Sequence, residues 1–433
     1  AGGPEGSTKE RDPAVRKRVI QETDLRQKAM ELAKEVSQIR GLKLKREIKI
    51  GVMNREQILE LIKVRLGEEY EEKDLLLEGA ILKQLGLLPP SLDFKNAFLE
   101  LLTDQVAGFY DPKERKLNIA DWLPIDIQMP ALAHEICHAL QDQNFSIKRF
   151  IKPVKDNSDL QLANISFVEG DCTGLMLEYI LKPIGKDLGS IGPMLDSLMS
   201  MALSSVQSTK FASSPMFLRE TLISPYRYGL AFVVQLRSQN PWSQIDKIFL
   251  RPPQSTEQIL HYDKYWQREH PVRIRAKTLP ALAEYKKAKV DTLGELQLKI
   301  YLQQGVDEDL ASQAAAGWGG DLLVAFEPLQ APKENELPLL VHLSTWDSEA
   351  DAVEFTNAQC RVLTKRFGKS VTSGANSWSY TDSEQKKSYV QRYEKHVLTI
   401  FGVPSSIDQN LPKQIWRLWQ IEGKRLKMAP SMM

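Results

Sequence analysis

The sequence has few cysteines, no excess of charge of either sign and no long apolar run. Three cysteines, Cys137, Cys172 and Cys360, are too few and too unevenly spaced for a disulfide scaffold, so they leave the redox compartment open. The 57 basic residues nearly balance the 56 acidic ones, which excludes the strong positive field that draws a protein to nucleic acid or anionic lipid. The longest apolar stretches fall short of the roughly 20 residues that a membrane-spanning helix needs. We therefore expect no nucleic-acid partner and no transmembrane segment.

The composition is typical of a globular protein with more than one domain. The chain has 433 residues, of which 42% are hydrophobic and 26% charged, and this length exceeds what one hydrophobic core usually serves. Residues 1–12, rich in glycine, proline and charge, predict a disordered lead. The start Ala1-Gly2-Gly3-Pro4 is compatible with a terminus left by removal of an export signal, so we expect a periplasmic or extracellular location, with the cytoplasm as the alternative.

Hydrophobic periodicity predicts an α+β fold class. Helical patterns occupy about residues 13–41, 75–85, 93–102, 158–181 and 215–237, with another helix starting at Pro130 and one capped by Asn54. Alternating patterns predict strands over 46–52, 105–110 and 116–120, and further strands over 321–327, 339–345, 377–381 and 388–401 around a helix at 347–367. We expect a mainly helical domain with a small sheet over residues 13–290, followed by a smaller α+β domain over residues 291–433.

The run His134-Glu135-Ile136-Cys137-His138 carries the clearest chemistry in the sequence. It spells H-E-x-x-H, and two histidines four residues apart project from one face of a helix, where both imidazoles can bind one metal ion. Zinc held in this way keeps an open position for a water of lowered pKa, and Glu135 is placed to take its proton. The competing interpretation is a solvated helix with two incidental histidines. The apolar neighbours Leu132, Ala139 and Leu140 argue for a buried helix instead.

A catalytic zinc ion usually has a third protein ligand, which must come from outside the motif. The third histidine of the longer metzincin pattern is absent after His138. Glu169 is the best candidate, because it lies among apolar residues where an unpaired carboxylate would be costly to bury. The alternative is that Glu169 forms a structural salt bridge. Glu178 on the same helix is a rival ligand, but its neighbours Tyr179 and Lys182 are typical of a more exposed position.

These segments together resemble the gluzincins, the thermolysin-like metallopeptidases. The resemblance covers roughly residues 93–275 and is carried by three runs, which also resemble those of a group of uncharacterised bacterial proteins. The runs are Gly108-Phe109-Tyr110-Asp111-Pro112, the segment from His134 to Gln143, and Val168-Glu169-Gly170-Asp171. The resemblance implies a zincin-like domain in which His134, His138 and Glu169 bind Zn²⁺ and Glu135 is the general base. It also implies that the strand near residues 105–110 offers its edge to an extended peptide.

One position departs from the thermolysin pattern. Those enzymes carry an acidic residue four positions after the glutamate ligand, where it orients a histidine, whereas this chain has Thr173. Asp171 or Asp142 would then have to orient the histidine.

Two downstream segments could donate a hydrogen bond to the oxyanion of a tetrahedral intermediate. His261 follows a Pro252-Pro253 break and can end a short helix directed at the site, although a surface or capping role fits it equally well. Tyr226 and Tyr228 lie in the helical segment 215–237, where core packing is the competing role. Cys137 and Cys172 each follow a proposed ligand by three positions, so their sulfur atoms either approach each other or remain buried thiols.

The sequence therefore predicts a zinc-dependent peptidase that acts on a peptide or protein substrate, with Glu135, His261 and Tyr226 as catalytic residues. The alternative is a catalytically inactive, zinc-containing module that binds a protein without cutting it. If the protein had a purely structural interaction role, the pattern of His134, Glu135, His138 and Glu169 would be a coincidence. Residues from about 295 onwards contain no metal or nucleophile constellation, and we expect that half to shape the cleft or to bind a partner.

Overall fold

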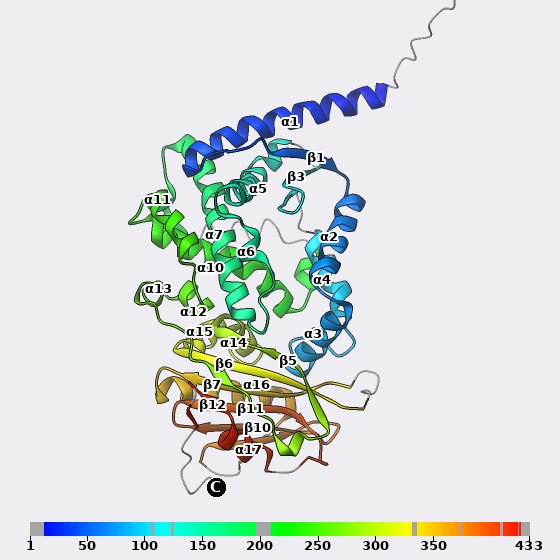
Figure 1. Cartoon of the computed structure of the whole chain (residues 1–433), viewed down its shortest axis with the longest axis vertical. Coiled ribbons are helices and arrows are strands. Elements are labelled where there is room, and N and C mark those ends of the chain that lie inside the picture. Colours follow the sequence, from blue (N-terminus) through cyan, green and yellow to red (C-terminus); the bar gives the residue numbers. More distant parts are fainter. Residues whose placement is uncertain are drawn as a thin grey trace, which may run out of the picture.

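The computed structural model describes residues 13–104, 108–122, 125–195, 209–330, 336–372, 375–407, 410–422 and 424–425. The described chain is a mixed α+β structure, as expected from the sequence. A helical half carries a three-stranded sheet, and a C-terminal half is built on a seven-stranded sheet (Figure 1). Among the described helices, none has an apolar stretch long enough to cross a membrane. The expected disordered lead, residues 1–12, lies outside the described residues.

The first sheet lies beside the long N-terminal helix. Helix α1, Pro13–Arg40, precedes strand β1, Lys49–Met53, which runs parallel to β3, Lys116–Ala120. Strand β2, Gly108–Asp111, pairs antiparallel with β3, so the strand order is β1-β3-β2 and β2 lies at an edge. Residues 105–107 of the expected edge strand lie outside the described residues.

Local sequence signals set several helix starts in this half. The expected Asn54 cap forms: its side chain accepts from the Gln57 N–H while the Gln57 side chain accepts from the Asn54 N–H, and α2 follows over Arg55–Glu69. The helix expected from Pro130 begins earlier, at Ile125, with Pro130 inside it. Helix α7, Ser158–Leu181, has the expected bounds. The other long helices of this half are α3, Glu72–Gln84; α4, Phe94–Asp104; α5, Ile125–Phe145; and α10, Met216–Arg237.

The described part of the helical half also contains short helices. They are α6, Lys148–Ile151; α9, Thr209–Ser213; α11, Trp242–Ile245; α12, Thr256–Leu260; and α13, Tyr262–Gln267. The described residues also form the 3₁₀ helices η1, Lys182–Ile184; η2, Leu188–Met194; and η3, Asp246–Leu250, while η4, Pro280–Leu282, packs below the C-terminal sheet.

Helices α7 and α10 cross at two glycines. A Cβ added at Gly170 would lie 2.1 Å from the backbone carbon of Gly229, and a Cβ at Gly229 would lie 1.8 Å from the Ser166 carbonyl oxygen. Both obstacles are main-chain atoms, so a side chain at either glycine would force the helices apart. Gly170 directly follows Glu169 and Gly229 lies one turn after Tyr226, so this crossing also sets how α10 approaches the predicted site.

The C-terminal half is built on an antiparallel sheet of order β5-β6-β7-β11-β10-β9-β8. The strands are β5, Tyr285–Asp291; β6, Trp318–Pro328; β7, Leu339–Trp346; β8, Val371–Thr372; β9, Ser377–Thr381; β10, Lys387–Tyr393; and β11, His396–Val403. The single strand expected over 388–401 is therefore wrong, because the chain reverses after Tyr393 in a hairpin whose first turn residue, Glu394, has a positive φ of 50°. The helices are α14, Gly294–Leu302; α15, Glu308–Ala315; α16, Glu349–Phe367; and α17, Leu411–Leu418.

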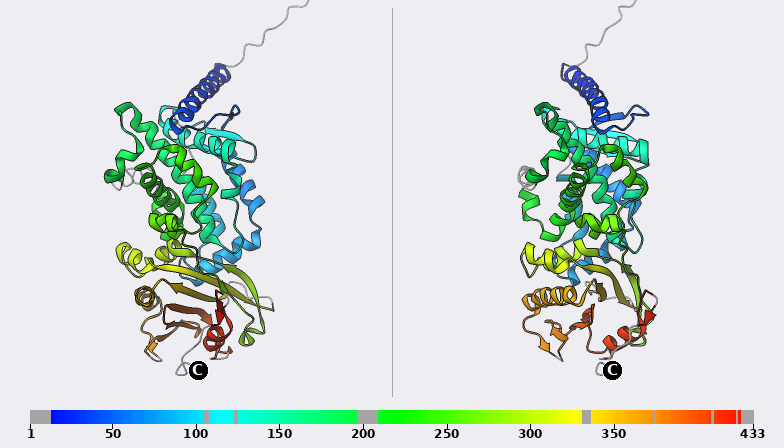
Figure 2. Two further views of the ribbon diagram at one scale, coloured as in Figure 1. Left: turned by 60° about the vertical axis from the view of Figure 1, so that its left-hand side comes forward. Right: turned by 90° about the vertical axis from the view of Figure 1, so that its left-hand side faces the viewer.

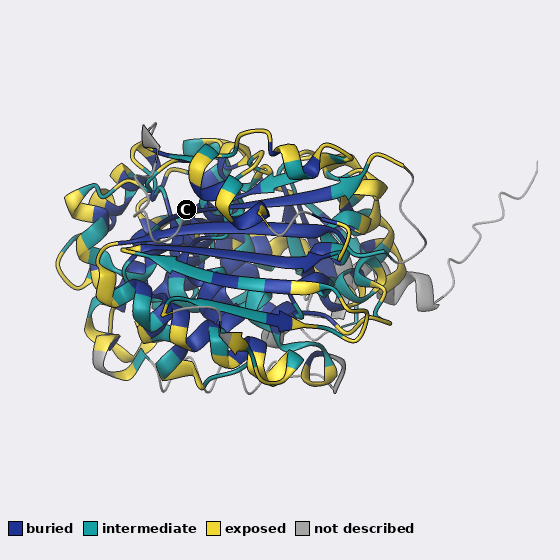
Figure 3. Cartoon of the chain, turned by 90° about the horizontal axis from the view of Figure 1, so that it is seen from below, coloured by how far each residue is buried: buried dark blue, intermediate teal, exposed yellow. Residues whose placement is uncertain are grey.

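Alternate residues of the central strands enter two different cores. On β6, Leu322 and Val324 pack with Trp416 and Trp419 below the sheet, whereas Leu323 faces α14 and α16 above it. Seen from below, the central strands are almost entirely buried (Figure 3). The lower face is covered by α17 and by a small sheet of β4, Ile274–Arg275; β12, Gln420–Ile421; and β13, Lys424–Arg425.

The two halves share one hydrophobic core. Ile81 and Leu82 of α3 and Leu218 of α10 belong to the same buried cluster as Leu323 on β6 and Phe401 on β11. The views of Figure 2 show the helices stacked on one face of the sheet. Residue 291, where we expected a second domain to begin, is the last residue of β5. The sheet therefore starts earlier in the chain than that boundary.

The Gly229→Ala variant tests the crossing of α7 and α10. We expect it to lower the free energy of unfolding by about 1–3 kcal/mol, because the new methyl group meets a main-chain oxygen that cannot move alone. Chemical denaturation followed by circular dichroism measures the change. Gly185→Ala is the control for any general cost of replacing glycine, since an added Cβ there meets nothing within 4 Å, although its φ of 69° adds some backbone strain. Equal stability of Gly229→Ala and the wild type would contradict the close crossing.

Candidate metal centre

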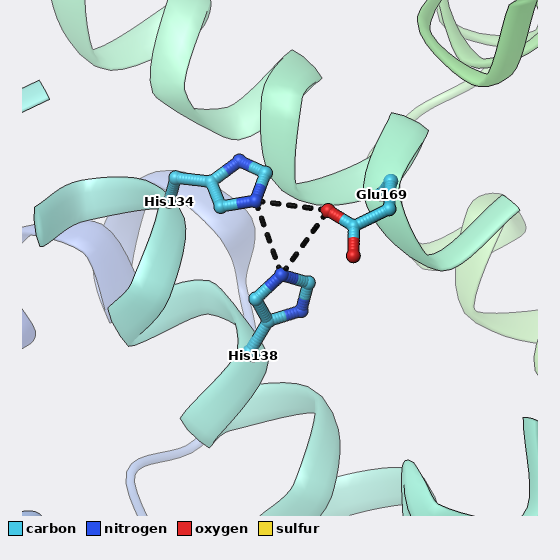
Figure 4. A group of neighbouring side chains, drawn as sticks. All are labelled: His134, His138 and Glu169. Carbon is cyan, nitrogen blue, oxygen red and sulfur yellow. Dashed lines mark hydrogen bonds and ion pairs between the residues drawn. The ribbon is translucent and has the colours of Figure 1, made fainter. Parts of the chain in front are cut away.

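Helices α5 and α7 bring the three predicted ligands together (Figure 4). The Nε2 atoms of His134 and His138 lie 3.1 Å apart. Oε2 of Glu169 lies 3.1 Å from Nε2 of His134 and 3.4 Å from Nε2 of His138. Both histidines are buried, and Glu169 is nearly so. Three potential ligand atoms from residues 35 positions apart thus form one small triangle.

The triangle fits a tetrahedral metal ion. Zinc–nitrogen and zinc–oxygen bonds of about 2.0–2.1 Å place the ligand atoms of a tetrahedron roughly 3.3–3.4 Å apart. The three distances of 3.1, 3.1 and 3.4 Å are close to that spacing. Two imidazole nitrogens and one carboxylate oxygen are also a donor set found in catalytic zinc sites, with the fourth position open. The residues therefore suit zinc in both geometry and chemistry.

The charges in the triangle depend on one another. Burial by itself would raise the pKa of Glu169, but the neighbouring His138 and His134 hold that pKa well below its usual range. Burial would lower the pKa of His138, but the Glu169 carboxylate outweighs it and raises that pKa to about 9. Without a metal ion, the site therefore holds a proton in the place where a metal cation would bind.

Glu135 lies beside the triangle and next to the edge strand β2. Its Oε2 accepts a hydrogen bond from the backbone N–H of Tyr110 over 2.7 Å. Burial is the main reason that the pKa of Glu135 is raised, although the neighbouring histidines oppose it. A carboxyl group with a raised pKa, held next to a candidate metal site, is suited to accept and release a proton.

A chain of hydrogen bonds fixes the orientation of His138. Its Nδ1 lies 3.0 Å from Oε1 of Gln141, whose Nε2 donates to the Val168 carbonyl and to Oδ2 of Asp171. Oδ1 of Asp171 accepts from Nε of Arg40 over 2.9 Å. Asp171 was predicted for this role from the sequence, whereas the roles of Gln141 and Arg40 were not. Gln141 could have been found from its position three residues after His138, on the same helix face.

Asp142, the other acid considered as a partner for a histidine, has a different role. Its Oδ2 accepts a hydrogen bond from the Tyr110 hydroxyl over 2.9 Å. Asp142 and Glu135 thus bond to the side chain and the backbone of the same strand residue. The two contacts tie the edge strand to α5.

Of the two tyrosines considered, only Tyr226 reaches the site. Its ring centroid lies 5.8 Å from that of His134. The charges of Glu169 and Glu135 raise the pKa of the Tyr226 phenol well above its usual value, so the hydroxyl keeps its proton although 40% of the residue is exposed. The Tyr228 hydroxyl accepts from Nζ of Lys299 instead.

The structure does not bring His261 to the triangle, so its expected catalytic role is withdrawn. Its Nε2 pairs with Oε1 of Glu295 on α14 over 2.8 Å. His261 directly follows the short helix α12. Thr256, the first residue of α12, donates hydrogen bonds to Asp159 near the start of α7. Asp159 precedes Glu169 by ten residues (169 − 159), or about 15 Å along a helix. The rival ligand Glu178 pairs with Arg237 over 3.3 Å.

Cys137 and Cys172 form a disulfide between the two helices that carry the ligands. Cys137 precedes His138 directly, and Sγ of Cys172 lies 3.4 Å from Nδ1 of the same histidine. The sequence left open whether these sulfurs bond. In the disulfide neither of them is a free thiolate, so the triangle's ligands remain the two histidines and Glu169.

Comparisons with known proteins leave the helical half unassigned. A family described as "Domain of unknown function (DUF8575)" matches residues 282–410, which include all seven strands of the larger sheet and none of the triangle. No curated protein and no solved structure matches the chain.

The raised pKa of His138 predicts that zinc binding releases a proton. A histidine must be neutral to bind the metal, so below about pH 9 the proton on this group has to leave. We expect the apparent affinity for zinc to fall roughly tenfold for each pH unit between 8.5 and 7. Competition with a chromophoric chelator measures the affinity. Calorimetry in two buffers with different ionisation enthalpies measures the released proton independently, and an affinity that does not change with pH would contradict the protonated triangle.

Proposed function

We propose that this protein is a zinc-dependent peptidase of the gluzincin type. The observation that carries the proposal is the triangle of His134, His138 and Glu169 with the partly buried carboxyl of Glu135 beside it. A structural zinc site needs no general base and usually has four protein ligands. Three ligands, an open position and an adjacent carboxyl support metal-assisted hydrolysis.

The residues around the triangle have distinct roles in this proposal. Bound zinc would supply Lewis acidity and lower the pKa of a water molecule in the open position. Glu135 takes the proton of the attacking water and passes it to the leaving nitrogen. Tyr226 donates its hydroxyl proton in a hydrogen bond to the oxyanion that develops on the scissile carbonyl. Gln141 keeps Nε2 of His138 directed at the centre of the triangle.

Strand β2 is the proposed seat of the substrate. It is an edge strand of the first sheet, and the Tyr110 N–H on it is directed to Glu135. An extended peptide added along this edge would have its main chain beside the general base. Recognition through main-chain hydrogen bonds would tolerate many side chains, which is why we assign a peptide class and no particular sequence.

The disulfide supports a location outside the cytoplasm. Disulfides persist in oxidising compartments and are rare where thiol reductants are abundant. The bond between Cys137 and Cys172 is fully buried and lies next to a proposed ligand. We therefore propose a periplasmic or extracellular protein.

The Glu135→Gln variant separates metal binding from turnover. We expect about one zinc ion per chain in both wild type and variant, and turnover of a fluorogenic peptide library lowered by about 10²–10⁴-fold in the variant, because the amide cannot take the proton of water. Metal analysis and the peptide assay are the two measurements. Glu31→Gln is the matched control, since it makes the same change on an exposed position of α1.

The outcomes of this experiment distinguish the competing functions. If the wild type binds zinc and cleaves no peptide, the protein is a zinc-containing binding module. If it binds no zinc when zinc is supplied, the metal centre itself is refuted.

Tyr226→Phe tests the proposed oxyanion donor. Removing one such donor typically lowers kcat by about 10²–10³-fold, and we expect a fall of this size with little change in KM, because the hydrogen bond strengthens only in the transition state. Steady-state kinetics on a cleaved peptide measure both constants. Tyr228→Phe on the same helix is the control, since that hydroxyl bonds to Lys299. Similar kinetics for the two variants would remove Tyr226 from the mechanism.

A further inference from the structure

Gln141 can have only one orientation in the described network. Its amide nitrogen lies 2.8 Å from an Asp171 carboxylate oxygen and 3.1 Å from the Val168 carbonyl oxygen, and both of these only accept hydrogen bonds from it. The amide oxygen must therefore face His138. Nδ1 of that imidazole then carries the hydrogen, which leaves the lone pair of Nε2 free for a metal ion.

Arg40 holds the Asp171 carboxylate that fixes this orientation. The two residues lie 131 positions apart in the sequence, and both side chains are completely buried. The guanidinium also pairs with Oδ1 of Asp246 over 2.7 Å and lies 4.4 Å above the Trp242 ring. Its place is thus fixed from three sides, and without it the Asp171 carboxylate would be buried with no cation beside it.

Arg40 is the last residue of α1. An N-terminal helix of this kind can be either a removable cover of the site or a permanent lobe of the domain. Ala29, Leu32 and Val36 of α1 pack in one buried cluster with Ile136 and Leu140 of α5. Figure 1 shows α1 lying across the top of the helical half, beside α5.

We propose that Arg40 is a positioning residue for the ligand His138, and that α1 is therefore a permanent part of the metal centre and not an inhibitory cover. Arg40 acts through Asp171 and Gln141, without touching metal or substrate. The inference rests on the proposed zinc site. It predicts that changes at the end of α1 weaken metal binding, whereas loss of an inhibitory cover would leave metal binding intact and raise turnover.

Zinc affinity of the full chain, measured by competition with a chromophoric chelator, tests the proposal. We expect Arg40→Met to bind zinc about 10–100-fold more weakly than the wild type, the range typical for losing a partner that orients a ligand. Arg237→Met is the matched control, because its guanidinium also lies above Trp242, at 4.8 Å, but pairs with Glu178 and not with Asp171. We expect unchanged zinc affinity in that control.

A double-mutant cycle separates positioning from general destabilisation. If Arg40 acts through Gln141, adding Arg40→Met to a Gln141→Leu variant weakens zinc binding no further. Arg40→Lys provides a milder test if the methionine variant does not fold, and we expect a smaller loss because an ammonium group cannot span Asp171 and Asp246 as a guanidinium does. Wild-type zinc affinity in the folded Arg40 variants overturns the positioning role. Absence of zinc binding in the wild type would instead refute the proposed function.

Discussion

The contact between α5 and α7 is the interaction on which the candidate site depends. Each helix alone carries an incomplete set of ligands, two imidazoles on one and a single carboxylate on the other. Three links cross the interface close to these ligands: the disulfide, the hydrogen bond from Gln141 to Asp171, and the hydrogen bond from Gln141 to the Val168 carbonyl. A small change in the spacing of the helices would alter every side of the triangle at once, so the rigidity of this interface determines the geometry of the site.

The glycine crossing extends this constraint to a third helix. Because Gly170 and Gly229 let main chains touch, α10 lies close enough to α7 for Tyr226 to stand beside Glu169. A larger residue at either position would move α10, and with it the Tyr226 phenol, away from the site. Gly170 and Gly229 thus determine, through the spacing of the two helices, whether Tyr226 reaches the site. Such dependence on distant residues is common in closely packed interiors.

Local patterns predicted the parts of the site that lie within single helices. The motif from His134 to His138 needs only helical spacing, and the bounds of α7 follow from its apolar pattern. The proximity of Glu169 was inferred from the cost of burying a carboxylate and from the gluzincin resemblance. Strands β6, β7 and β9 of the seven-stranded sheet were each predicted, and β10 and β11 were predicted as one strand because Glu394 carries no turn signal of its own. Strands β5 and β8 were not predicted.

The features of the site that were not predicted depend on contacts between residues far apart in the sequence. The bond from Arg40 to Asp171 joins residues 131 positions apart, and nothing in the local sequence of either residue indicates the other. His261 was chosen because a short helix could direct it at the site. The direction of that helix is set by Thr256 and Asp159, which place it at the far end of α7. Whether Cys137 and Cys172 can bond likewise depends on how α5 and α7 are rotated about their axes, which the sequence does not indicate.

Because both halves share one hydrophobic core, the C-terminal sheet is not expected to be stable without the helical half or a substitute for it. The segment that matches a known family, residues 282–410, includes the strands and the helices α14 to α16, but the same hydrophobic cluster also takes in Ile81, Leu82 and Leu218 from outside it. Another protein that inherited this segment alone would leave apolar side chains uncovered on its upper face. Such a protein would need polar residues at these positions or a separate partner chain that covers them. In other proteins with this segment, apolar residues on the upper face would therefore indicate that a helical half or a partner covers it, and polar residues would indicate that the face is exposed.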